Sequence, residues 1–199
     1  MPLQLRVVYK KRLCLSMVII LKMEIPWKQS DCERRIGDIL LFYTKASPLS
    51  NHHLSQFRVK DVTYNCMEQY LMYQKAIYFN DVFTGKKIMR AGRPPVQKAL
   101  GRTVKHFDAT VWKAVVPDIL AEGLKAKFSQ VPHCKNYLKL TTGMTLAEAS
   151  GTDNFYGIGF GLLAHEGVLS DQSKWGYNLL GKCLMNVREH LHDVLQCNS

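Results

Sequence analysis

Residues 65–81, NCMEQYLMYQKAIYFND, have the pattern of one amphipathic helix, and this stretch decides how the chain is interpreted. At about 100° per residue, seven steps nearly restore the starting direction, so Glu68 and Lys75 point the same way two turns apart. Met72 and Phe79 extend this apolar stripe. Burying a carboxylate and an amine on an apolar face is costly unless they pair with each other or serve in binding or catalysis. Glu68 and Lys75 are therefore candidates for a functional site. The alternative is an acid and a base that stay in solvent at the edge of the stripe.

Helices dominate the rest of the pattern, with a few short strands among them. A short apolar run predicts a strand over 39–43. A hairpin is expected over 57–64, after a turn-rich loop at 47–53. Further helices are expected near residues 82–90, 94–101, 110–128 (with a kink or break at Pro117) and 178–195. The pattern predicts a mainly α (α+β) domain that is single and compact.

Size, composition and cysteine content favour an intracellular globular enzyme. The 199 residues are enough for one domain with a large core, and 47% apolar with 22% charged residues is ordinary for such proteins. The six cysteines are scattered without a Cys-x-x-Cys pair, which argues against a zinc site and a disulfide framework and favours the cytoplasm: Cys14, Cys32, Cys66, Cys134, Cys183, Cys197. Cys66 is interpreted as a buried cysteine at a helix start rather than as a nucleophile.

The net charge of +11 is distributed unevenly along the chain. Residues 1–35 hold eight basic and three acidic residues, a net charge of +5. No acid lies between Val82 and Phe107, where the basic residues are Lys86, Lys87, Arg90, Arg93, Lys98, Arg102 and Lys105. Such a run attracts phosphates, either of a small molecule or of a nucleic-acid backbone. The alternative is a solvated helix face.

The N-terminal 35 residues are expected to be an extension to a domain that covers 36–195. Four basic residues precede the nine-residue apolar run of Leu13–Leu21, a pattern that resembles a signal peptide. The run is shorter than the ~20 residues of a membrane span, and no small-x-small cleavage site follows it. We therefore expect an extension that packs as a strand or stays disordered, and no membrane association.

Several other residues have a functional and a plain interpretation. The pair His52-His53 is interpreted as surface polarity, because no partner lies at metal-ligand spacing along the chain. Asp153 suits an acceptor for ribose hydroxyls, or is a turn residue. Trp112 belongs to the core or lines a pocket. The glycines of 157–161 lack the context of a dinucleotide fingerprint and instead allow close backbone approach to a ligand, or a bulge.

An ordered series of short motifs between residues 40 and 191 resembles the NADAR (YbiA-like) family. The series consists of Ser47-Pro48-Leu49-Ser50-Asn51, Glu68-Gln69-Tyr70, Lys75-Ala76, Phe79-Asn80-Asp81, Leu100-Gly101-Arg102, Trp112, Lys127-Phe128, Leu140-Thr141-Thr142-Gly143, Leu146-Ala147-Glu148, Asp153, Tyr156-Gly157-Ile158-Gly159, Asn178-Leu179-Leu180-Gly181, Leu184-Met185 and Arg188. The chain departs from the family in two places. Tyr156 stands where the family usually has Trp, and Gln69 stands where many members have His.

The resemblance implies an N-glycosidase with a YbiA-like helical fold, no cofactor and no metal. It implies Lys75, Glu68 and Asp153 as catalytic residues, and these residues as substrate-binding: Asn51, Arg102, Trp112, Glu148, Tyr156, Gly157. Lys75 would form an imine with an opened ribose if burial lowers its pKa, while Glu68 would shuttle protons.

The implied substrate is a phosphorylated ribosyl or ADP-ribosyl small molecule, and the resemblance leaves its identity open. Early riboflavin-pathway intermediates and ADP-ribosylated guanine, free or in nucleic acid, are both compatible with it. A different class of function also stays open, a non-catalytic module that binds ADP-ribose or nucleic acid. The presence of both Glu68 and Lys75 favours catalysis, because a binding module needs phosphate donors more than a buried acid and amine. The oligomeric state is not predicted.

Overall fold

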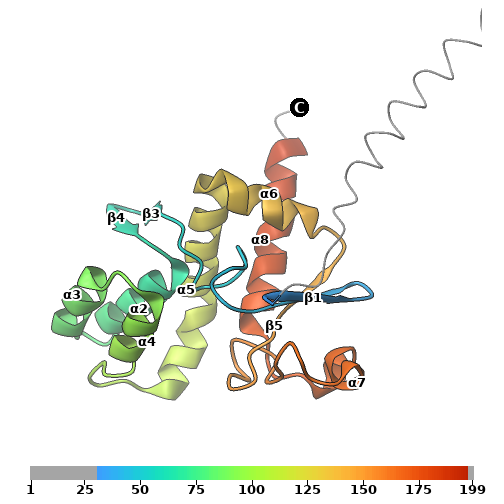
Figure 1. Cartoon of the computed structure of the whole chain (residues 1–199). Coiled ribbons are helices and arrows are strands. Elements are labelled where there is room, and N and C mark those ends of the chain that lie inside the picture. The colour runs from blue at the N-terminus through green and yellow to red at the C-terminus, as the bar shows by residue number, and fades with distance from the viewer. Residues whose placement is uncertain (1–30, 197–199) are drawn as a thin grey trace, which may run out of the picture.

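A long central helix, α5 (Ala109–Gln130), organises the structure, with α2 (Met67–Tyr78) on one side and α8 (Leu179–Gln196) on the other (Figure 1). This computed structural model describes residues 31–196. The shorter helices are α3 (Val82–Arg90), α4 (Pro94–Gly101), α6 (Pro132–Leu140), α7 (Glu166–Leu169) and a 3-10 turn, η1 (Gln172–Lys174). α3 and α4 pack on α2 and complete a helical group around it.

Two small sheets flank the helices. β2 (Ile39–Phe42) is the middle strand of the first sheet, antiparallel to β1 (Glu33–Ile36) and parallel to β5 (Thr145–Glu148). All four residues of β2 are buried, because Leu40 and Phe42 face the main core while Ile39 and Leu41 face a smaller cluster. A strand covered on both faces reads as a continuous apolar run. The second sheet is the hairpin β3 (Phe57–Val59) and β4 (Val62–Tyr64).

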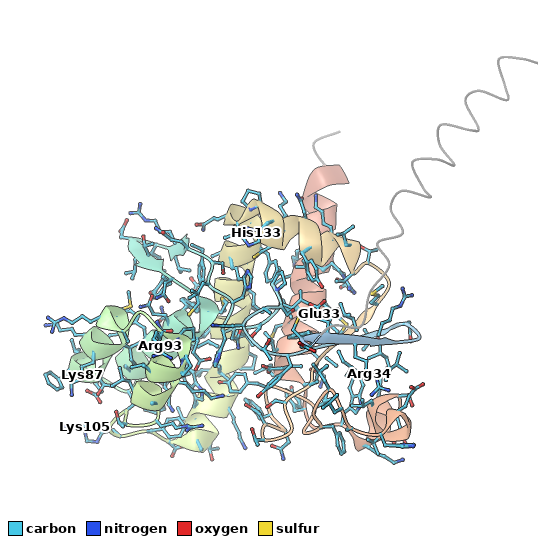
Figure 2. The ribbon with its side chains drawn as sticks, viewed as in Figure 1. Glu33, Arg34, Lys87, Arg93, Lys105 and His133 are labelled. Carbon is cyan, nitrogen blue, oxygen red and sulfur yellow. The ribbon has the colours of Figure 1, made fainter. Side chains whose placement is uncertain are left out.

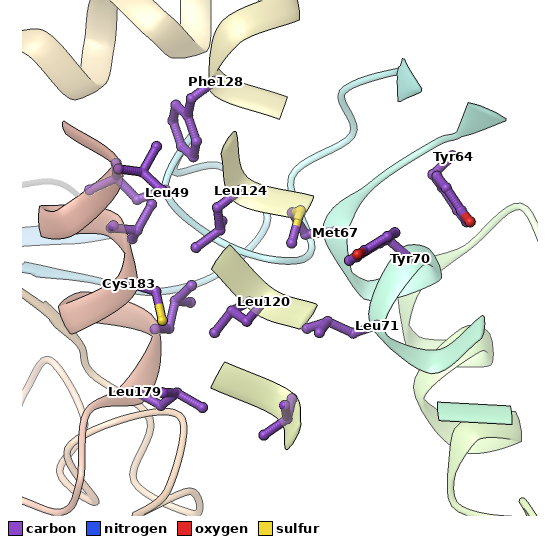
Figure 3. Packing of buried hydrophobic residues seen from close by; sticks show 14 of the residues in the cluster. Leu49, Tyr64, Met67, Tyr70, Leu71, Leu120, Leu124, Phe128, Leu179 and Cys183 are labelled. Atoms are coloured by element: carbon purple, nitrogen blue, oxygen red, sulfur yellow. The ribbon is translucent and has the colours of Figure 1, made fainter. Parts of the chain in front are cut away.

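The main core lies where α5 is covered on two sides (Figure 3). Leu120 and Leu124 of α5 lie between Cys183 of α8 and Leu71 of α2, all buried. Gly123 lets α2 come close, because a Cβ at this position would overlap the Tyr70 ring. This close contact fixes the position of α2, the helix that carries Glu68 and Lys75.

The predicted fold class is confirmed, and the predicted strand 39–43, the hairpin and the helices correspond to observed elements. Pro117 does not break α5, which runs without interruption from Ala109 to Gln130. Cys66 is the N-cap of α2 and is buried, as expected. Five elements were not predicted: β1, β5, α6, α7 and η1. β1 and β5 are four residues long and are stabilised by pairing with β2. None of the described helices is both long and apolar enough to cross a membrane.

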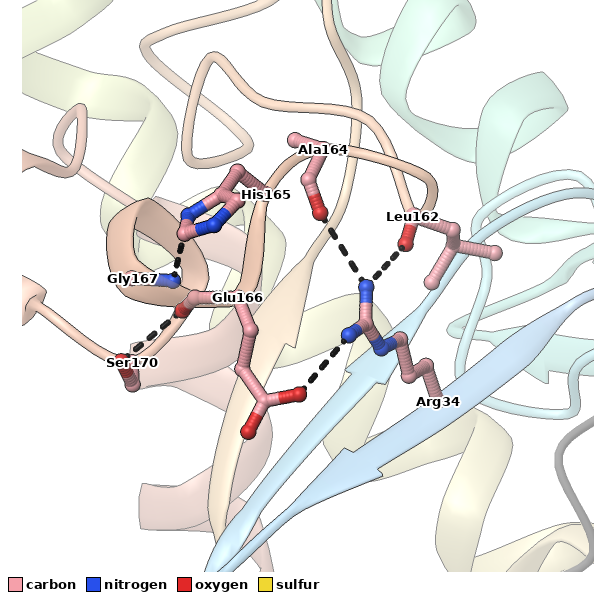
Figure 4. Close-up of polar contacts among 7 residues, drawn as sticks. All are labelled: Arg34, Leu162, Ala164, His165, Glu166, Gly167 and Ser170. Carbon is pink, nitrogen blue, oxygen red and sulfur yellow. Dashed lines mark hydrogen bonds and ion pairs between the residues drawn. The ribbon is translucent and has the colours of Figure 1, made fainter.

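The domain boundary expected after residue 35 falls inside β1, which belongs to the first sheet. Glu33 accepts hydrogen bonds from Ser47 Oγ at 2.6 Å and from the Tyr137 hydroxyl. The Arg34 guanidinium donates to the carbonyls of Leu162 and Ala164 and pairs with Glu166 at 3.1 Å (Figure 4), contacts that hold the loop before α7. The folded domain therefore includes residues 31–35. The apolar run predicted as a strand or a disordered segment, Leu13–Leu21, lies outside the described residues.

We predict that residues 1–30 are dispensable while β1 is not. A chain beginning at Asp31 should keep the thermal stability and activity of the full chain. A chain beginning at Gly37 loses the contacts of Glu33 and Arg34 and should be destabilised by roughly 2 kcal/mol or more, because hydrogen bonds to charged groups contribute about 1.5–3 kcal/mol each. Thermal unfolding of the two chains provides the comparison, and equal midpoints would show that β1 contributes nothing.

Candidate active site

A cavity of about 220 Å³ lies between α2, α4, the start of α5 and the segment that follows β5. Eight of the nine site residues predicted from the sequence line it: Asn51, Glu68, Lys75, Arg102, Trp112, Glu148, Asp153 and Tyr156. These residues lie up to 105 positions apart in the sequence, and the fold places them around one hollow. The ninth, Gly157, is not among the lining residues.

Glu68 and Lys75 are both buried on the cavity side of α2, at 5% and 9% exposure. The prediction that they share one face is confirmed, and the interpretation as a solvated pair is wrong. Burial lowers the pKa of Lys75, and the nearby Glu68 carboxylate opposes that fall. Lys75 Nζ also lies 3.6 Å from the centroid of the Phe107 ring. Burial thus favours the neutral amine, while the Glu68 carboxylate and the Phe107 ring both favour the ammonium.

Two residues that line this cavity each carry a buried oxygen without a protein partner. Among the side chains that the structure describes, Asn51 Oδ1 and Glu68 Oε1 are buried atoms that have no hydrogen-bond partner. The other Glu68 oxygen, Oε2, lies 3.4 Å from His52 Nε2, an ion pair when the imidazole is protonated. Buried polar atoms are nearly always satisfied in folded proteins, so two orphans that line one cavity point to a ligand with hydrogen-bond donors.

The loop that carries Asn51 and His52 is held by a buried lysine. Lys127 of α5 has no exposed surface, and its Nζ donates to Pro48 O at 2.7 Å and to Ser50 O at 3.2 Å. Burial lowers the pKa of Lys127 to about 8. The Glu68 backbone N–H also donates to Asn51 O at 2.9 Å, which joins the loop to the start of α2. Lys127 thereby positions two cavity residues without reaching the cavity itself.

The opposite wall carries two carboxylates at the end of β5. Burial and the charge of Asp153 raise the pKa of Glu148 to about 7, and Lys98 opposes this rise. The Glu148 backbone N–H donates to Asn178 Oδ1 at 3.2 Å, so the start of α8 fixes the strand end. Asp153 Oδ1 accepts from the backbone N–H groups of residues 155 and 156, which fixes the position of its carboxylate beside the cavity. At neutral pH, Glu148 can supply a proton.

An aromatic pair forms a further wall of the cavity. Trp112 is buried and also lines the cavity, and its Nε1 donates to the Tyr156 hydroxyl at 3.1 Å. Burial raises the pKa of Tyr156, so the phenol keeps its proton. The hydrogen bond depends on a hydroxyl that a tryptophan at position 156 would not have. Tyr156 therefore keeps an aromatic ring where the family usually has tryptophan, and its hydroxyl adds a hydrogen bond with Trp112.

Gln69, the second departure, has a structural role. Its Nε2 lies within hydrogen-bond distance of three backbone carbonyls between Ile88 and Ala91, and its Oε1 accepts from Asn65 N. These contacts tie α2 to the end of α3. Cys66 is also structural, since burial raises the pKa of its thiol to about 11.

The basic run divides into two groups. Lys98 and Arg102 line the cavity, and Arg93 with Lys98 lines an adjoining cavity of about 380 Å³ that shares His52, Glu148 and Asp153 with the first. The other four are exposed and line neither cavity: Lys86, Lys87, Arg90, Lys105. Figure 2 shows Lys87 and Lys105 toward the outer edge of the helical group, with Arg93 nearer the middle. Only three of the seven basic residues, Arg93, Lys98 and Arg102, are therefore placed to meet a ligand in these cavities.

Six further residues line the cavity that were not predicted as site residues: His52, Leu71, Met72, Lys98, Gly101 and Phe107. The interpretation of His52 as surface polarity is wrong, because its ring meets Glu68. Its position beside Asn51 was the signal that could have found it. No local pattern distinguishes Lys98 within the basic run, and Phe107 lies in an irregular segment before α5.

Comparisons with known proteins find relatives that match most of this chain. The family model of the NADAR domain matches residues 41–192. An N-glycosidase of Acanthamoeba polyphaga mimivirus is 44% identical over 127 residues, which cover 63% of this chain and 74% of the relative. The protein irg-1 of Caenorhabditis elegans is 34% identical over 176 residues, covering 80% of this chain and 82% of that protein.

A solved structure shares the fold. The NMR structure of the E. coli protein YbiA superposes with a TM-score of 0.65 at 25% sequence identity, over 84% of this chain and 93% of that one.

Gly157 provides a test of how the carboxylate wall is built. A Cβ there would lie 2.6 Å from Glu148 O and 3.0 Å from Asp153 O, both backbone atoms, whereas a Cβ at Gly161 would meet nothing within 4 Å. We predict that Gly157→Ala lowers the free energy of unfolding by about 1–3 kcal/mol, the usual cost of overpacking, and reduces activity. Gly161→Ala is the matched control and should behave as the parent chain. Equal denaturant midpoints for the two variants would contradict the close approach.

Proposed function

The chain belongs to the NADAR domain family, and we propose on this basis that it hydrolyses the N-ribosidic bond of a phosphorylated ribosyl or ADP-ribosyl substrate through Lys75 and Glu68. Relatives named N-glycosidase, the mimivirus protein among them, make the chain an N-glycosyl hydrolase. The bond cleaved joins a ribose C1 to a nitrogen. The substrate and the roles of the individual residues are the proposed part.

One observation carries the assignment of residues. A buried amine and a buried carboxylate with an orphaned oxygen, Lys75 and Glu68, lie in one cavity with a second carboxyl group whose pKa is near neutrality. Groups whose environments move their pKa values toward working pH mark sites of proton transfer and nucleophilic attack. A module that only binds ADP-ribose has no need of this combination.

Lys75 acts as the nucleophile in the proposed reaction. The ribose ring opens when its C1–O bond breaks and the oxygen takes a proton, which leaves a double bond between C1 and the leaving nitrogen. Neutral Lys75 Nζ adds to C1, a proton moves from Nζ to the leaving nitrogen, and the C1–N bond to that group breaks. Water then hydrolyses the lysine imine, which releases the sugar aldehyde and restores the amine.

Carboxyl groups on two walls supply and receive the protons. Glu68 lies on the same helix face as Lys75 and can move protons between Nζ and the leaving nitrogen. Glu148 holds a proton near neutral pH and can deliver it from the opposite wall to the ring oxygen. Asp153 orients a ribose hydroxyl, and Asn51 Oδ1 accepts a hydrogen bond from the substrate.

The adjoining cavity supports an extended substrate. The first cavity alone, about 220 Å³, is smaller than the 300–1,000 Å³ typical of ligand sites, but it shares four residues with the second cavity of about 380 Å³. Arg93, Lys98 and Arg102 place positive charge around both. A ribose in the first cavity would leave the second for phosphates or a base, which favours an ADP-ribosyl compound over a ribose monophosphate.

We predict that Lys75→Ala lowers kcat by more than about 1,000-fold while the fold is retained, as expected for loss of a nucleophile. Release of free ADP-ribose from ADP-ribosylated guanosine, followed by chromatography, measures the rate. A riboflavin-pathway ribosyl phosphate serves as the comparison substrate. Lys86→Ala is the control, because Lys86 is exposed and outside both cavities.

Borohydride reduction should trap a sugar adduct on Lys75 in the parent chain and in Lys86→Ala only. Parent rates in Lys75→Ala would reject the nucleophile, and tight ADP-ribose binding without turnover of either substrate would favour the non-catalytic module.

We predict that Arg102→Ala raises KM about 3- to 10-fold with a smaller change in kcat. A guanidinium can hold phosphate in a bidentate fork, but the exposure of Arg102 weakens the contribution. The KM of the variant should also depend less on salt than that of the parent. Initial rates at several ionic strengths provide the measurement, and an unchanged KM would assign Arg102 to the solvated face together with Lys86.

A further inference from the structure

A second cluster of potential ligands lies outside the two cavities, where the loop that carries His52 meets the first turn of α6. Its members are His53, His133 and Cys134, and one ligand atom from each lies within 4.8 Å of the others. His53 Nε2 is 3.4 Å from His133 Nε2, and Cys134 Sγ is 3.3 Å from the same nitrogen. The partners of His53 lie 80 residues further along the chain, so no spacing in the sequence reveals them.

The hydrogen bond at the other nitrogen of His53 defines its tautomer. His53 Nδ1 lies 2.9 Å from Lys45 O, and because a carbonyl oxygen only accepts, Nδ1 carries the hydrogen. In the neutral ring, Nε2 then presents a lone pair toward His133. A histidine that donates one N–H to a backbone carbonyl and offers its other nitrogen is the usual arrangement of a metal ligand with its supporting contact.

We propose that His53, His133 and Cys134 bind a zinc ion. With zinc–nitrogen bonds of about 2.0–2.1 Å and zinc–sulfur bonds of about 2.3 Å, tetrahedral ligands lie about 3.3 Å apart for two nitrogens and about 3.6 Å apart for nitrogen and sulfur. Two of the three observed separations are close to these values. The third separation joins His53 Nε2 and Cys134 Sγ, and a small movement of these side chains would bring it to the required distance.

The two imidazoles and the thiol of this cluster determine which class of metal ion it can bind. Imidazole and thiolate ligands suit zinc and copper, whereas magnesium and calcium prefer oxygen. Cys134 is buried and His133 is exposed, so the fourth position faces solvent and can take a water molecule. Binding releases one proton, from the Cys134 thiol, while His133 shifts its hydrogen to Nδ1.

The ion would tie two elements together and would not take part in the reaction. The three ligands are not among the residues that line the two cavities. His53 comes from the loop that contains Asn51, and His133 and Cys134 come from α6 (His133 is labelled in Figure 2). Lys127 already holds this loop through the carbonyls of Pro48 and Ser50, and zinc would anchor it at a second point. The proposal does not depend on the proposed N-glycosidase activity.

Titration of the full-length, reduced chain with Co²⁺ tests the site, since cobalt bound to thiolate gives a charge-transfer band that zinc removes by displacement. We expect the parent chain to bind one equivalent of cobalt and to show this band. Zinc should raise the midpoint of thermal unfolding of the parent chain. Cys134→Ser should lose the band, and His133→Ala, an exposed position, should bind cobalt at least about 10-fold more weakly. Cys183→Ser and His190→Ala are matched controls that should bind as the parent does.

Two results would overturn the proposal. Retention of the band at parent affinity in both Cys134→Ser and His133→Ala would show that other cysteines hold the ion. Absence of any cobalt or zinc binding below about 100 µM by the parent chain would identify the cluster as a hydrogen-bonded histidine pair beside a thiol. Circular dichroism of each variant separates loss of the site from loss of the fold.

Discussion

The close contact between α2 and α5 at Gly123 is the constraint on which the site depends. Because glycine leaves room for the Tyr70 ring, α2 lies directly on α5, and Leu71 reaches the layer formed by Leu120 and Leu124. That contact buries one side of α2 in the core and turns the side with Glu68 and Lys75 toward the wall that β5 provides. A larger residue at position 123 would overlap Tyr70 and Met67, and α2 could not keep this position against α5.

Burial shifts the pKa values of Lys75 and Glu148, which lie on opposite walls of the cavity, in opposite directions. It lowers the pKa of Lys75 and raises that of Glu148, and both shifts reduce charge inside the cavity. The folded state pays for this arrangement in stability. Glu148 keeps its proton up to about pH 7 when folded but loses it near pH 4.5 when unfolded, so the free energy of unfolding falls as the pH rises through that interval. In the proposed reaction, this retained proton is the one that Glu148 delivers.

The loop of Asn51 and His52 has no regular structure of its own and is positioned from outside. Lys127 binds its carbonyls, Glu68 N donates to Asn51 O, and His53 meets α6. Each contact joins segments distant in sequence. The glycine loop after β5 is fixed in the same manner, since Gly157 approaches Glu148 O so closely that a side chain would not fit. Both loops therefore present their side chains on a rigid support, as precise substrate positioning requires.

The sequence by itself determined the helices α2, α3, α4, α5 and α8, the strand β2 and the shared face of Glu68 and Lys75, because each follows from the periodicity of a continuous segment. The family motifs supplied the other predicted site residues, but not six more that line the cavity, His52, Lys98 and Phe107 among them. Only the tertiary structure decided which members of the basic run reach the cavities, that β1 belongs to the domain, and that His53 has partners in α6. These features depend on contacts between residues far apart in the chain, and local periodicity carries no information about such contacts.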